Sequence, residues 1–259
     1  MKKFVSAIIL ASLCSLASAQ DIEISIENLA TADGFFLTPL WAGLHGADFD
    51  LFDVGSAVTP GLEALAEDGI IGDLSMEFAQ GGRLEFDPLA NPAGFCGAPL
   101  LDPGEMASST LTPINPVAYQ YLSFASMLIP SNDAFIGTDA PIRVFNPDGS
   151  FMGTQVFEIR GSDIYDAGTE ENDTMGAPFS GIGGDATDTV DGVAAAHPGL
   201  ANFEGTPIPT GGTIGAGTAP GADDLVARIT IRQVPEPASF SLMGLAGLSL
   251  LGLRRRRRR

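Results

Sequence analysis

Alternating apolar and polar residues predict strands near both ends of the central part of the chain. Residues 22–27 read IEISIE and residues 227–232 read ARITIR, each with an apolar residue at every second position. A period of two places one set of side chains on a buried face and the other in solvent. The run YLSFASMLI over residues 121–129 is almost continuously apolar, which predicts a central strand. The first and last strands therefore indicate a mainly-β domain with both of its ends in sheet.

Two further patterns add a hairpin and a short helical connection. The runs 142–145 (IRVF) and 155–160 (QVFEIR) flank the turn-forming residues 146–149 (NPDG), which predicts a β-hairpin. Residues 61–67 and 73–79 carry leucines and a phenylalanine at helical spacing, with glycines between and after them. The sequence therefore predicts two short helices on one connection.

The first 19 residues have the pattern of a secretory signal peptide. Two lysines precede an apolar run that ends in Ala17-Ser18-Ala19, so cleavage is expected between Ala19 and Gln20.

The other end of the chain carries an apolar run followed by six arginines. Residues 238–253 hold no charge, and residues 254–259 are all arginine. A sixteen-residue helix spans about 24 Å, somewhat less than the ~30 Å hydrocarbon core, but snorkelling arginines and local thinning still allow it to span. Arginines after such a helix stay in the cytoplasm. A plain C-terminal membrane anchor is one interpretation.

The order of parts in this tail is more specific than an anchor requires. Val234-Pro235-Glu236-Pro237, the apolar helix and the arginine cluster together resemble the PEP-CTERM sorting signal of Gram-negative bacteria. The resemblance implies processing by an exosortase-type transpeptidase and release or transfer to the cell surface. Three parts are therefore expected: a signal peptide (1–19), one domain (20–233) and a sorting signal (234–259).

Charge is distributed very unevenly along the chain. The formal net charge is −19, but eight of the 13 basic residues lie at the two ends, which leaves five against 32 acidic residues, or about −27. Such a body repels nucleic acid and anionic membranes and attracts cations. We expect no nucleic-acid partner, and membrane contact only through the C-terminal helix before processing.

Two acidic segments follow strand-like runs and are candidates for a cation site. Asp133 follows the apolar run 121–129, with Asp139 six residues later, and Asp166 and Glu170 lie in the segment YDAGTEENDT. Short acidic side chains and free carbonyls at strand ends supply the oxygen ligands that calcium prefers. The alternative is that both segments are ordinary solvated loops of an acidic protein.

Five segments, in order, resemble the spondin N-terminal domain in its bacterial form, over roughly residues 21–232. They are WAGLHGADFDLFDVGSAVTPGLEALAEDG (41–69), SFASMLIPSNDAFIGTD (123–139), DIYDAGTE (163–170), HPG (197–199) and VARITI (226–231). The resemblance implies an all-β fold, an antiparallel β-sandwich similar to C2 domains, with a bound calcium ion and a role in adhesion or extracellular matrix.

The resemblance also implies calcium ligands. Two family aspartates fall on Asp133 and Asp166. A third family ligand, a glutamate at the start of the Ser-Phe strand, has no match, since residues 110–112 read TLT there. Asp139, Glu170 or a water molecule would have to take its place, or the affinity for calcium is lower.

Catalytic signatures are missing from the sequence. The two histidines, His45 and His197, show no zinc-ligand spacing, and there is no G-x-S-x-G motif or Walker loop. We therefore expect a non-enzymatic module that binds exopolysaccharide or a surface protein. Two alternatives stay open: a carbohydrate-active enzyme, because 32 acids allow many carboxylate pairs, and a purely structural matrix component.

Overall fold

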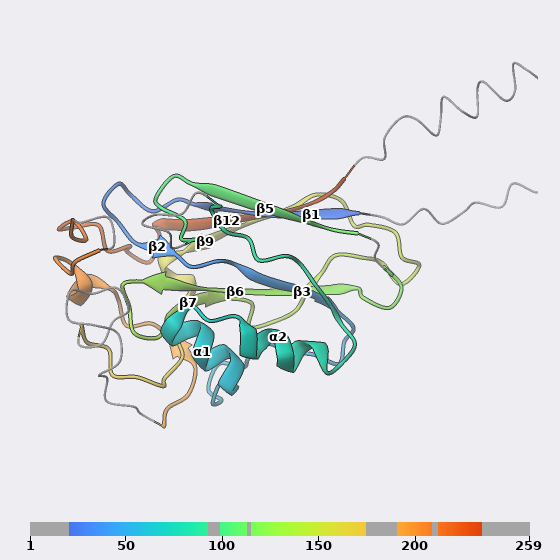
Figure 1. Cartoon of the computed structure of the whole chain (residues 1–259), viewed down its shortest axis with the longest axis horizontal. Helices are drawn as coiled ribbons and strands as arrows, with labels where there is room; N and C mark the ends of the chain where they lie inside the picture. The colour runs from blue at the N-terminus through green and yellow to red at the C-terminus, as the bar shows by residue number, and fades with distance from the viewer. Residues whose placement is uncertain (1–20, 93–98, 113–114, 175–190, 209–211, 235–259) are drawn as a thin grey trace, which may run out of the picture.

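Two antiparallel sheets face each other in the computed structural model, which describes residues 21–92, 99–112, 115–174, 191–208 and 212–234 (Figure 1). The four-stranded sheet has the order β5 (Met106–Leu111), β1 (Ile22–Asn28), β12 (Leu225–Gln233) and β9 (Gln155–Arg160). The main path of the eight-stranded sheet is β11 (Ala195–Ala196), β10 (Ile164–Asp166), β7 (Ala134–Gly137), β6 (Tyr121–Ile129), β3 (Trp41–His45) and β4 (Leu84–Glu85). Two short strands, β2 (Phe36–Leu37) and β8 (Ile142–Arg143), also pair with β6. The predicted all-β sandwich is confirmed.

The three strands predicted most firmly from periodicity are confirmed. Strands β1 and β12 pair from Ile22↔Gln233 to Asn28↔Ala227 and occupy the two central positions of their sheet. Their alternate isoleucines are fully buried. Strand β6 is buried at every position after Tyr121, as its continuous apolar run requires.

Both short helices are also present, as α1 (Pro60–Asp68) and α2 (Gly72–Ala79). The Thr59 hydroxyl accepts a hydrogen bond from the Leu62 backbone N–H and caps the start of α1. Gly69 ends this helix with a φ of 66°, a conformation that glycine adopts without steric cost. Two one-turn 3₁₀ helices, η1 (Gly161–Asp163) and η2 (Ala201–Phe203), complete the regular elements of the described residues.

The predicted hairpin over residues 142–160 is confirmed only next to its turn, where Phe145 and Phe151 form an isolated antiparallel bridge. The turn at residues 146–149 forms, since the Asn146 backbone N–H donates to the Ser150 carbonyl at 2.9 Å. The strands on either side then separate: β8 pairs with β6, whereas β9 pairs with β12 in the other sheet. The open edge of β12 offers β9 a long antiparallel partner and lets Phe157 and Ile159 pack on the core. This non-local pairing outweighs the local turn signal.

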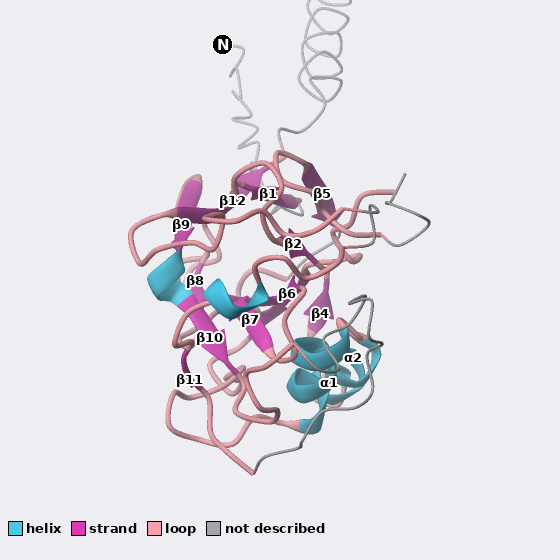
Figure 2. Ribbon diagram, turned by 90° about the vertical axis from the view of Figure 1, so that its left-hand side faces the viewer, coloured by secondary structure: helices cyan, strands magenta, loops and turns pink. Residues whose placement is uncertain are grey.

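The domain has three layers, the four-stranded sheet, the eight-stranded sheet and the two helices, which Figure 2 shows from the side. A hydrophobic core lies between each two neighbouring layers. The larger core lies between the two sheets and includes Ile24, Phe124 and Ile229. The smaller core lies between the eight-stranded sheet and the two helices, where Trp41, 1% exposed, packs edge-on against Phe78 at 5.0 Å between ring centroids. Residues 21–234 thus supply both sheets and both cores.

Both chain ends leave the domain at the same end of the sandwich. The Val234 backbone N–H donates to the Asp21 carbonyl at 2.9 Å, so the start of β1 and the end of β12 lie side by side (Figure 1). The loop after β6 and the loop before β12 lie at the opposite end, called here the distal end.

The predicted signal peptide (1–19), Gln20 and the tail from residue 235 onward lie outside the described residues. In the part of the chain that the structure describes, no helix has the length and apolar character needed to cross a membrane.

Candidate cation site

The link between β6 and β7 buries an aspartate at the distal end. Ser131 closes this tight link: its hydroxyl accepts from the Ala134 backbone N–H at 3.1 Å and donates to the Leu128 carbonyl at 2.5 Å. Asp133 is 0% exposed within it. A fully buried carboxylate is rare in proteins unless a partner offsets its charge.

The second aspartate of the prediction lies directly beside the first. Asp166 ends β10, which pairs antiparallel with β7 so that Asp166 is opposite Ala134. This register brings the Asp166 side chain, 8% exposed, into contact with that of Asp133. The structure therefore brings together the two ligands that the family resemblance implied.

Backbone amides hold one oxygen of Asp133 and leave the other free. Its Oδ2 accepts from the backbone N–H groups of Gly168, Thr169 and Glu170 at 3.1, 3.2 and 3.3 Å. This concave loop requires glycine at position 168, where φ is +73° and a Cβ would come within 2.5 Å of the Val193 carbonyl. Asp133 Oδ1 has no hydrogen-bond donor, although it is fully buried.

Burial and mutual repulsion make this pair of carboxyl groups costly to ionise. Burial, and after it the negative charge of Asp166, together raise the pKa of Asp133 to about 7. The three backbone amides oppose that shift without cancelling it. At neutral pH the pair therefore keeps a proton readily unless a positive charge offsets it.

Two asparagine side chains add oxygens beside the pair. Asn132 donates its Nδ2–H to the Glu171 carbonyl, and Asn172 donates its own to Asp166 Oδ2. Each leaves its Oδ1 buried without a donor, as Asp133 does.

Three buried oxygens without donors, Oδ1 of Asp133, Asn132 and Asn172, fit a hard cation, whereas both oxygens of Asp166 accept hydrogen bonds. Among the described residues, no three Asp, Glu, His or Cys side chains gather closely enough to hold a metal ion. Calcium, however, also accepts amide and backbone oxygens, and two carboxylates with two amide oxygens form a suitable partial set. The sequence alone did not single out the two asparagines, because their role depends on the register of β7 and β10.

His197 borders the same region but stays neutral. Its Nδ1 accepts from the Gly199 backbone N–H at 3.0 Å, which places the ring proton on Nε2. Burial lowers the pKa of His197, and the nearby Asp166 charge only partly opposes this. His45 lies at the other end of β6, opposite Tyr121, and both of its ring nitrogens have partners. A shared zinc site for the two histidines therefore has no support here.

Of the remaining predicted ligands, Glu170 lies beside this pair and Asp139 lies away from it. Asp139 is exposed after the far end of β7, whose four residues alone extend about 13 Å. Glu170 contributes its backbone amide to Asp133, but its carboxyl group lies near Glu67 of α1. Residues 110 and 111 belong to β5 in the other sheet, so this segment is not the start of β6.

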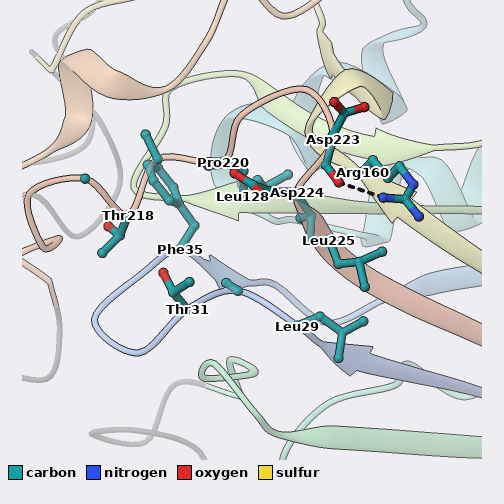
Figure 3. Close-up of a pocket in the computed structure, with 14 residues that line it drawn as sticks. Leu29, Thr31, Phe35, Leu128, Arg160, Thr218, Pro220, Asp223, Asp224 and Leu225 are labelled. Carbon is teal, nitrogen blue, oxygen red and sulfur yellow. Dashed lines mark hydrogen bonds between the residues drawn. The ribbon is translucent and has the colours of Figure 1, made fainter.

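A cavity of about 430 Å³ opens at the same distal end (Figure 3). Phe35, Leu128 and Leu225 give it an apolar wall, and Thr31 and Thr218 add hydroxyl groups. At its edge the Arg160 guanidinium donates to the Asp223 carbonyl at 2.6 Å. Its size lies in the range of small-molecule sites.

Comparison with known families gives a match for the domain. The Spondin_N family model matches residues 35–190, which include β2 through β10 and both aspartates of the pair. The chain belongs to the Spondin_N family. Strands β1 and β12, which pair at the centre of one sheet, lie outside the matched range. Compared with curated proteins, the chain shows no significant match.

The tail matches a second family model, the PEP-CTERM protein-sorting motif, over residues 233–259. A motif of this kind marks a protein of Gram-negative bacteria for export and for processing by an exosortase-type system. The predicted sorting signal is confirmed, and its first matched residue is the last residue of β12.

Proposed function

We propose that this Spondin_N protein is a non-enzymatic adhesion module of the cell surface or extracellular matrix, with calcium bound at its distal end. The observation that carries the proposal is the contact between the buried Asp133 and Asp166 side chains, beside amide oxygens that lack donors. Asp133, Asp166, Asn132 and Asn172 would hold the ion. Bound calcium would supply the positive charge that the aspartate pair lacks, and would fix the two loops to each other.

The position of this site suits a protein that is tethered at its C-terminus. The sorting motif follows β12 directly, so the domain lies close to the membrane until it is processed. The distal end, with the aspartate pair and the cavity, then points away from the membrane (Figure 1). We propose this end as the surface that binds exopolysaccharide or a surface protein.

The geometry of the aspartate pair favours binding over glycoside hydrolysis. Two catalytic carboxyl groups flank the scissile bond at separations of about 5–9.5 Å. Asp133 and Asp166 are in direct contact, and the loop backbone covers one oxygen of Asp133. No sugar ring fits between them, which supports an ion-binding role for this pair.

Adhesion to the producer's own exopolysaccharide tests the proposal. Residues 20–234 are immobilised, and binding of purified polysaccharide is measured with calcium and after its removal by EDTA. We expect removal of calcium, or Asp133→Asn, to weaken binding at least tenfold, and the exposed control Asp53→Asn to leave it unchanged. Adhesion that survives EDTA would place the binding surface elsewhere. The exported protein itself should begin at Gln20 and lack Arg254–Arg259, which intact-mass analysis checks.

A further inference from the structure

The four-stranded sheet ends in an open strand on the side of β9. Among the described residues, β9 pairs with β12 on one side and with no strand on the other, and Figure 2 shows it at the end of this row of strands. Proteins usually protect an open strand edge with proline, lysine or an inward-pointing charge. The sequence of β9, QVFEIR, has no proline or lysine, and its inward-facing residues Gln155, Phe157 and Ile159 are uncharged.

The register shows which backbone groups of β9 face the open side. The Leu29 backbone N–H donates to the Val226 carbonyl at 2.9 Å, so the even-numbered residues of β12 point their backbone groups toward β1. The odd-numbered residues of β12 then point toward β9, where they meet odd-numbered residues. Because backbone groups alternate in direction along a strand, those of Val156 and Glu158 are left on the open side.

Apolar side chains at this edge are covered less well than those at the centre of the sheet. Val156 is 55% exposed on the outer face. Phe157 and Ile159 pack against the larger core but are only partly buried, whereas Ile229 of the neighbouring β12 is fully buried. A further strand beside β9 would cover all three side chains and continue the core.

The four-stranded sheet is also a part of the acidic domain in which charges cancel. Its four strands carry three arginines and three glutamates, although the body of the chain has a net charge of about −27. Two acidic copies of the chain repel each other over most of their surface, and the neutral sheet offers them a place to approach. The arginines pair with glutamates of the same sheet at 3.3, 2.9 and 2.7 Å, as Arg160–Glu158, Arg228–Glu27 and Arg232–Glu23.

We propose that two copies of the chain associate through antiparallel pairing of their β9 strands about a two-fold axis at Val156. The two four-stranded sheets then become one continuous sheet. Even-numbered residues meet even-numbered residues, so the core-facing side chains of both copies stay on the same face. Arg160 lies outside the pairing, because its backbone N–H already donates to Asp163 Oδ2 at 2.8 Å.

The choice of Val156 as the centre follows from the side chains on the outer face. In this register the two Val156 side chains are opposite each other, and Glu158 is opposite Thr154 of the second copy. An axis at Glu158 would bring two carboxylates together, which is unfavourable in a cross-strand pair. An axis at Phe157 would place each Glu158 opposite an apolar valine.

Antiparallel pairing places the two sorting tails at opposite ends of the dimer. In one copy both chain ends leave beside each other, where Val234 bonds to Asp21. Two copies held in the same membrane point the same way, so they cannot pair in this manner. The dimer therefore suits copies that have been released, or copies on two facing surfaces. This last consequence rests on the proposed adhesion function, whereas the pairing itself does not.

Sedimentation equilibrium of residues 20–234 in EDTA tests the pairing apart from calcium. Wild type at about 100 µM, above the micromolar dissociation constant of a modest interface, should have the mass of two chains. Val156→Pro removes an N–H on the open side and no bond to β12, a position where edge strands tolerate proline. It should have the mass of one chain and nearly the Tm of wild type. The matched control Ser108→Pro makes the same change on the open side of β5 and should keep the mass of two.

A second variant covers the case in which Val156→Pro does not fold. Val156→Lys keeps the backbone and places two like charges at the axis, which should weaken the dimer about tenfold or more. A wild type with the mass of one chain would overturn the proposal, and so would a dimer that persists in the Val156 variants. A mass above two chains, or loss of the dimer in Ser108→Pro alone, would assign the contact to β5 and overturn it as well. Failure of calcium-dependent polysaccharide binding would leave a dimer in EDTA standing.

Discussion

The four-stranded sheet and the distal loops fill their interiors in opposite ways. At the centre of the sheet, β1 and β12 bury isoleucines at alternate positions and keep their charged residues outside, where Arg228 pairs with Glu27 at 2.9 Å. In the distal loops the chain instead buries Asp133, Asp166 and Glu170 without any basic partner. The sheet follows the rules that stabilise folds, and the loops break them, which is typical of a binding site.

Truncation of a sheet isoleucine should give the largest loss of stability. Ile229 is fully buried between the sheets, so Ile229→Ala should lower the free energy of unfolding by about 2–5 kcal/mol. For a domain of this size this corresponds to roughly 5–15 °C in Tm. Thermal unfolding followed by circular dichroism measures it. The loss should be equal with and without calcium, and a calcium-dependent loss would break the distinction between sheet and loops.

The pH dependence of the calcium-free protein should show a smaller effect that comes from the loops alone. The pKa of Asp133 is about 7 in the folded protein and near 3.8 in the unfolded chain. The folded state therefore binds the proton more tightly, and this contribution to stability is lost as pH rises from about 4 through about 7. Glu170 acts in the same direction. We expect Tm in EGTA to fall by several degrees between pH 5 and pH 7.5.

A neutral variant of Asp133 separates the pH effect of this one carboxyl group from the effect of the many other acidic residues. Asp133→Asn imitates the protonated carboxyl group, so its Tm in EGTA should change less with pH than that of wild type. Asp53→Asn, an exposed control, should follow wild type. If the Tm of the calcium-free protein instead rises toward pH 7.5, the distal end does not hold buried carboxyl groups without a positive partner.

The difference between the regular sheet and the distal loops also determines which features the sequence predicts well. The period of two over residues 22–27 and 227–232, and the helical spacing around Leu65 and Leu74, are local signals that match their burial in the structure. The partner of β9 is not a local property, so the turn at residues 146–149 predicted the wrong pairing. The hydrophobic period of a segment shows which of its faces is apolar. It does not show with which distant strand the segment pairs.

The candidate site could be predicted only in part for a similar reason. Family resemblance pointed to Asp133 and Asp166, and the β7–β10 register places them together. Asp139 seemed close along the chain, but the extended strand β7 separates it from Asp133. Glu170 was predicted as a substitute ligand, and the turn at Gly168 presents its backbone amide to Asp133, while its carboxyl group lies near Glu67. Proximity along a chain does not reveal the direction of a side chain across a turn.

The most direct test of the account is the effect of calcium on thermal stability at neutral pH. Binding to the native state alone stabilises by about 2.7 kcal/mol at a hundredfold excess over Kd, or roughly 5–10 °C for this domain. We expect millimolar calcium to raise Tm of residues 20–234 by this amount and magnesium to raise it less, because magnesium demands tighter octahedral geometry. Asp133→Asn and Asp166→Asn should each remove most of the calcium effect, while Asp53→Asn keeps it. Equal stabilisation by both ions, or equal behaviour of all three variants, would show charge screening and contradict a specific site.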